Sequence, residues 1–180
     1  MNGNASIVAR LRMLGLKCDD VPVDQVNSAI AALACFPMYM VANVHGWTTD
    51  RQFKLPVVDI QGSEAFREAV SIGAQGLEIS AEHSNVVGSM LTSAKPPDRV
   101  IYEYALATLK EYLAVAQPAV ADQLRSEVAR MIVAVARASG ERLLGLGEKV
   151  APEERESIGH IASELRLTES PKAAEYLAKL

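Results

Sequence analysis

A long stretch of the chain, from Gln25 to Thr49, contains no Asp, Glu, Lys or Arg. A segment of this length and composition has to be buried, either in a bilayer or in a protein core. A membrane-spanning helix needs about 20 mostly apolar residues, whereas this stretch includes Asn27, Asn43 and, near its middle, Pro37. We therefore expect two core helices that break before Pro37, with no stable membrane insertion; a spanning helix is the alternative.

The composition of the whole chain favours helices. Of the 180 residues, 27 are alanine, the best helix former, and only 5% are aromatic. Apolar residues recur at three- and four-residue steps, most clearly from Pro118 to Ser139, and the only short β-branched run is Val57–Ile60. We predict one all-α domain spanning residues 1–180, with seven to eight helices. Helical spacing is found in nine segments, which cover residues 4–14, 22–44, 49–60, 63–72, 75–91, 97–114, 118–139, 152–165 and 171–180.

Charge and cysteine content exclude several classes of protein. The formal net charge is −4, and 18 basic residues are scattered among 22 acidic ones. Nucleic-acid binding depends on clustered Lys and Arg, so we expect no nucleic-acid partner. Cys18 and Cys35 form no CxxC pair and do not suggest a disulfide scaffold. With no signal-peptide pattern in residues 1–16, we expect a cytoplasmic protein.

Two segments of the chain share one pattern. Met38–Asp50 and Met131–Glu154 each contain an apolar helix end, a glycine, a loop and a helix start. Gly46 and Gly140 occupy the position where a left-handed cap would end the helix. The pattern is consistent with a duplicated helix–loop–helix related by a pseudo-twofold axis, and equally with two unrelated helical hairpins.

The second of these segments resembles the TerB and TerB-like tellurite-resistance family. The resemblance is carried by VAVARASG at 133–140, LGLG at 144–147 and KVAPEE at 149–154, and by residues 158–165. It implies a compact all-α fold of about seven helices, a role in stress or metal resistance, and no established enzymatic activity. His45 and Ser139 stand before the two glycines, where the family prefers Asp.

The resemblance also implies a divalent-metal site at acidic helix starts. The matching residues are Asp50, Glu153 and Glu154. Carboxylates at these positions also cap free N–H groups and complement the helix dipole, which is the alternative explanation. The only cofactor that we consider is therefore a divalent metal ion.

A second candidate site comes from spacing alone. Glu156, His160 and Glu164 lie four residues apart and share one face of the expected helix. Because the row is about 12 Å long, one zinc or manganese ion contacts only two neighbours, such as Glu156 and His160. A solvated charged face is the alternative. The same two explanations apply to Glu78, Glu82 and His83, which we expect at the surface.

One loop is expected to contact a partner. His45 and Trp47 flank Gly46 between two expected helices, and tryptophan is enriched at interfaces, although it also anchors loops into cores. A protein partner or a homodimer is therefore considered.

These patterns favour a non-enzymatic, TerB-like stress-related binding or interaction module, with a response to divalent metal. No P-loop, GxSxG or HExxH motif is present. The alternative function is a helical-bundle metalloenzyme that uses Glu156 and His160.

Overall fold

The computed structural model describes residues 2–18, 23–48, 77–92, 98–140, 150 and 152–180. These residues form α-helices and one short 3-10 helix, and none of them forms a strand. The all-α prediction is therefore confirmed. The elements are α1 Asn2–Met13, α2 Val23–Leu33, α3 Phe36–Thr48, α5 Ala81–Thr92, α6 Arg99–Val115, α7 Pro118–Gly140, α8 Pro152–Glu164, η1 Leu167–Glu169 and α9 Pro171–Leu177.

The chain breaks between α2 and α3, as Pro37 predicts. The helix stops at Leu33, and Pro37 is the second residue of α3, where its missing N–H leaves no helical bond unmade. Of the candidate spanning segment Gln25–Ala42, 83% is buried within the protein. It is the one segment among the described residues that is long and apolar enough to cross a bilayer, and here it packs as a core.

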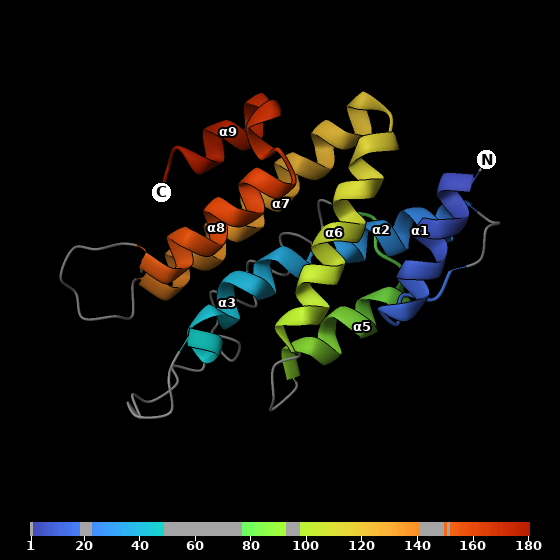
Figure 1. Cartoon of the computed structure of the whole chain (residues 1–180), viewed down its shortest axis with the longest axis horizontal. Coiled ribbons are helices and arrows are strands. Elements are labelled where there is room, and N and C mark those ends of the chain that lie inside the picture. Colours follow the sequence, from blue (N-terminus) through green and yellow to red (C-terminus); the bar gives the residue numbers. More distant parts are fainter. Residues whose placement is uncertain (1, 19–22, 49–76, 93–97, 141–149, 151) are drawn as a thin grey trace.

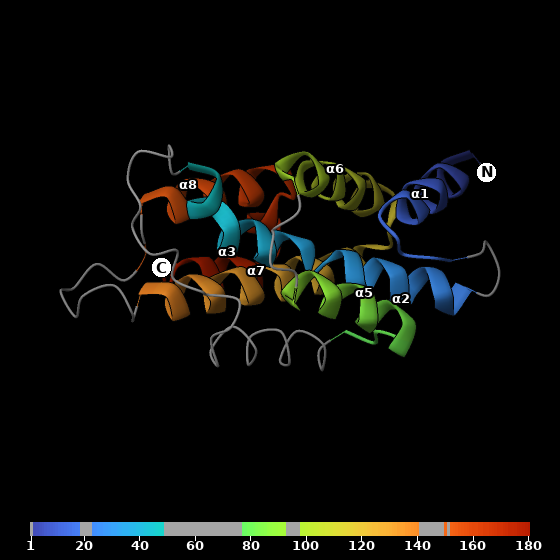
Figure 2. The same ribbon diagram turned by 90° about the horizontal axis from the view of Figure 1, so that it is seen from below.

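Helix α3 is the centre of that core. Every residue from Phe36 to Ala42 is buried, and α3 contacts α6, α7 and α8. Figures 1 and 2 show α3 running between these helices, with α1, α2 and α5 gathered at the end of the molecule that holds the N-terminus. At the C-terminal end of the chain, α9 packs on α7.

Two helix starts show why the boundaries fall where they do. The Asp98 carboxylate accepts the Val100 N–H at 3.5 Å, so α6 begins directly after Asp98. The Ser170 hydroxyl accepts the Ala173 N–H at 3.4 Å, and Pro171 follows as the first residue of α9.

Several predicted boundaries were wrong. Helix α3 continues to Thr48 and α7 to Gly140, so the backbone of His45, Gly46 and Trp47 is helical, not a loop, and neither glycine ends its helix in a left-handed cap. The following segments, including the expected helices at 49–60 and 63–72, lie outside the described residues. The proposed duplication depends on those segments and stays a prediction.

Candidate functional site

The acidic start of α8 has one exposed and one buried carboxylate. Glu153 is exposed, whereas Glu154 is 1% exposed. Asp50, which the TerB resemblance would add, lies outside the described residues. A helix-capping role alone does not require burial, because exposed carboxylates at helix starts also stabilise the helix, by about 0.3–1 kcal/mol.

One turn further along α8, Ser157 lies on the same face as Glu154. Its side chain is buried, and its Oγ has no hydrogen-bond partner among the residues that the structure describes. Buried polar groups are almost always hydrogen-bonded, so each exception requires an explanation. Glu154 and Ser157 therefore place two side-chain oxygen groups on the buried side of the first two turns of α8.

The helix that approaches this end of α8 is α3. The two helices are in contact, and the C-terminal end of α3 lies beside the N-terminal turns of α8 in both views (Figures 1 and 2). The backbones of His45 and Trp47 belong to this end of α3. Residues that the sequence offered as two unrelated candidates thus come from adjacent helix ends.

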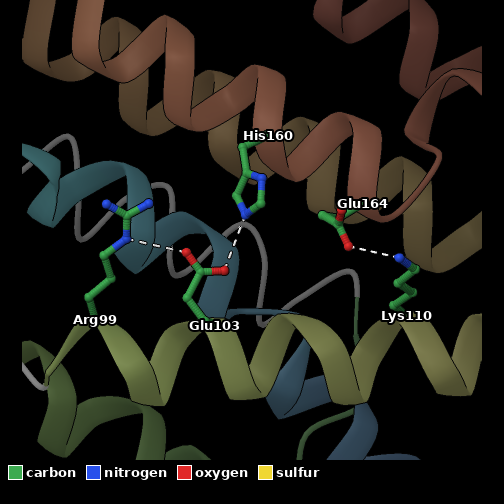
Figure 3. A network of polar contacts seen from close by, with 5 residues as sticks. All are labelled: Arg99, Glu103, Lys110, His160 and Glu164. Atoms are coloured by element: carbon green, nitrogen blue, oxygen red, sulfur yellow. Dashed lines mark hydrogen bonds and ion pairs between the residues drawn. The ribbon is translucent and has the colours of Figure 1, made fainter.

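The three α8 residues Glu156, His160 and Glu164 do not form one site. Glu156 is exposed, whereas the His160 Nε2 lies 3.1 Å from a carboxylate oxygen of Glu103 on α6. Glu164 accepts a 2.8 Å hydrogen bond from the Lys110 ammonium. Figure 3 shows both pairs bridging α6 and α8, with Arg99 on the second oxygen of Glu103 at 3.3 Å.

The two side-chain pairs that join α6 and α8 are electrostatic contacts at the surface. The side chains of Glu103 and His160 are 37% and 40% exposed. The hydrogen bond from Lys110, its positive charge and the nearby His160 hold the pKa of Glu164 below its usual value. Among the described residues, no group of three or more His, Cys, Asp and Glu is placed to hold a metal. Glu103 was missed because it is 57 residues from His160 and no local spacing connects the two.

The prediction of a surface position for His83 was wrong. His83 is 1% exposed, and it joins three segments of the chain. Its Nδ1 lies 2.7 Å from the Ser28 Oγ on α2 and 3.2 Å from the Ser80 Oγ, and its Nε2 lies 2.7 Å from the Lys17 carbonyl oxygen. We refer to His83, Ser28, Ser80 and the Lys17 carbonyl as the His83 cluster.

The partners fix the tautomer of His83. A carbonyl oxygen only accepts, so Nε2 carries the hydrogen and donates it to Lys17. Nδ1 therefore accepts, and the Ser28 hydroxyl donates to it while accepting the Ser80 N–H at 2.7 Å. Every polar atom of the imidazole is thus satisfied. This serine–histidine contact lies in the interior and has the features of a structural cross-link.

The interior also holds unreactive thiol and phenol groups. Both cysteines are free and buried, and burial raises the pKa of the Cys35 thiol to about 12. Burial likewise raises the pKa of Tyr39, whose hydroxyl donates to the Val87 carbonyl at 2.7 Å. Cys35 is therefore a small residue of the core.

Comparison with models of known protein families, with curated proteins and with solved structures found no match for this chain.

Proposed function

We propose that this chain is a non-enzymatic, TerB-like helical module that binds a divalent cation at the start of α8 and serves stress-linked interactions. The observation that carries the proposal is the buried pair of oxygen ligands, the Glu154 carboxylate and the Ser157 hydroxyl. The TerB resemblance independently selects this helix start.

The ligand chemistry favours a hard cation. Carboxylate and hydroxyl oxygens suit Ca²⁺, Mg²⁺ and Mn²⁺, whereas zinc prefers nitrogen and sulfur as well. The adjacent helix α3 ends at Thr48, and Asp50, which the TerB resemblance adds to the acidic set, lies outside the described residues. Binding of the cation would connect α3 to the α7–α8 hairpin, so the occupied form would present a different surface to a partner.

Thermal unfolding with added Ca²⁺, Mn²⁺ and Zn²⁺ tests the proposal. A cation that binds only the folded state stabilises it by about 2.7 kcal/mol at one hundred times its dissociation constant. We expect Glu154→Gln to abolish the metal-induced rise in melting temperature. Glu156→Gln is the matched control, because it removes the same charge from an exposed position on the same helix.

The quantity compared is the change in melting temperature when metal is added to each variant. A difference in stability between the variants without metal therefore does not affect the comparison. An unchanged melting temperature at millimolar metal contradicts the cation site. An equal response in Glu154→Gln and the native chain places the metal elsewhere.

The metal-dependent enzyme has less support in the structure. His160 meets a carboxylate across the α6–α8 contact, but that carboxylate belongs to Glu103, not to Glu156. A catalytic zinc site needs three protein ligands and an open position, and the described residues supply two here. We therefore favour the binding module.

A further inference from the structure

The last turn of α1 carries an accessible methionine. Met13 is the last residue of that helix, and 78% of its side chain is exposed, the largest exposed fraction among the large hydrophobic side chains of the described residues. Three other methionines, Met38, Met40 and Met131, are buried. A water-soluble oxidant therefore reaches the Met13 sulfur directly, whereas the core shields the other three.

A hydrogen-bond donor on another helix already faces this sulfur. The Tyr104 hydroxyl donates to the Met13 Sδ at 3.5 Å, although the two residues are 91 positions apart in the chain. Tyr104 belongs to α6, which contacts α1 and lies beside it in both views (Figures 1 and 2). A thioether sulfur is only a weak acceptor, so this contact contributes little while the methionine is reduced.

The Tyr104 ring has a second contact with α1. The Arg10 guanidinium carbon lies 5.7 Å from the centroid of the ring, and the same guanidinium pairs with Glu111 of α6 at 3.0 Å. Arg10 and Met13 are three residues apart, so they lie on one face of α1. The ring and the hydroxyl of Tyr104 therefore meet the same helix face, and the cation–π contact keeps the phenol beside the Met13 sulfur.

We propose that Met13 is an oxidation site for hydrogen peroxide, and that its sulfoxide tightens α1 on α6. The sulfur gives two electrons to the O–O bond of the peroxide and gains one oxygen, while the other oxygen leaves as water. The polar sulfoxide oxygen accepts a stronger hydrogen bond from Tyr104 than the thioether sulfur does. In a core the same oxidation would disrupt packing. This inference does not depend on the cation site at α8.

The rate of oxidation at each methionine is the first test. Peptide mass spectrometry of the full chain, after timed exposure to hydrogen peroxide, measures these rates one by one. Met13 is expected to be oxidised at least tenfold faster than Met38, Met40 and Met131, because the core shields their sulfur atoms. A rate at Met13 no greater than at these buried residues overturns the proposal.

Hydrogen exchange before and after oxidation tests the contact with Tyr104. The Leu14 N–H donates to the Arg10 carbonyl and the Leu16 N–H to the Leu11 carbonyl, so these two amides report on the last turn of α1. Oxidation is expected to slow their exchange at least threefold. Tyr104→Phe keeps the ring beside Arg10 and removes only the hydroxyl donor, so it is expected to abolish the slowing.

Met13→Leu is the matched control for the peroxide treatment. It keeps every other methionine, including Met1 and Met90, whose side chains lie outside the described set. After the same treatment, this variant is expected to show no slowing of exchange at the end of α1. The proposal is overturned if oxidation does not slow this exchange in the native chain, or if the slowing persists in Tyr104→Phe or in Met13→Leu.

Discussion

His83 and His160 each join helices that are distant in the sequence, but in opposite environments. His83 is 1% exposed and has neutral partners at both ring nitrogens. The His160 side chain is 40% exposed and meets a carboxylate, Glu103, that Arg99 also contacts. The first cross-link lies inside the protein and the second at its surface.

Because the two contacts differ in burial, their contributions to stability are expected to rank opposite to their charge. Charged contacts look stronger, yet an exposed ion pair contributes only about 0–1 kcal/mol because water competes for both partners. A neutral buried hydrogen bond has a modest net value, but removing one partner leaves the other unsolvated, at a cost of about 1–3 kcal/mol. The structure therefore assigns the greater share of stability to His83.

Removing the His83 ring should have the largest effect. His83→Ala leaves the Ser28 hydroxyl and the Lys17 carbonyl without their partner and creates a cavity, so we expect a loss of about 3 kcal/mol. Urea unfolding followed by circular dichroism measures it. His160→Ala is the control, and equal losses in the two variants would contradict the comparison.

The next largest effect is expected at the serine of the buried cluster. Ser28→Ala removes the hydrogen-bond donor to His83 and the acceptor of the Ser80 N–H, and we expect a loss of about 2 kcal/mol. Ser89→Ala is the control, because its hydroxyl is exposed and donates to the Val86 carbonyl of its own helix. A loss in Ser28→Ala no greater than in Ser89→Ala would show that the cluster does not stabilise the fold.

The surface contact should show a weak, salt-sensitive coupling. A double-mutant cycle of Glu103→Gln and His160→Gln is expected to give a coupling free energy below about 1 kcal/mol. Raising the salt concentration from 0.05 M to 1 M should reduce it, because screening acts on exposed charges. A salt-independent coupling above 2 kcal/mol would mean that this pair is buried in solution.

The smallest effect is expected in the titration of Glu164. Lys110 lowers the pKa of this carboxyl from its usual 4.5, so the pair stabilises the fold above that value and the stabilisation is lost as the pH falls through the lowered pKa. Lys110→Met should raise the pKa of Glu164, as measured by NMR titration of the carboxyl carbon. An unchanged pKa would show that the Lys110 contact does not persist in solution.

The sequence predicted what depends on local pattern. Pro37 indicated the break between α2 and α3, and the apolar spacing after Pro118 indicated α7. The partners of His83 and His160 escaped prediction, because they lie between 55 and 66 residues away along the chain in three of their contacts. Gly46 was predicted to end a helix, whereas α3 continues to Thr48, because a glycine permits a helix to end but does not force it to end.

The packing of α9 on α7 has a consequence for how the chain acquires its structure. The elements α7, α8, η1 and α9 make many contacts with one another, and the contacts of Arg125 with Leu165 and of Arg137 with Lys179 close loops of 40 and 42 residues. The His83 cluster instead requires residues 17, 28 and 83 to meet, and closing larger loops costs more chain entropy. The C-terminal third should therefore gain hydrogen-exchange protection during refolding before the amides around His83 do, which pulse labelling would resolve. The buried histidine would then form its contacts after the C-terminal third of the chain has become ordered.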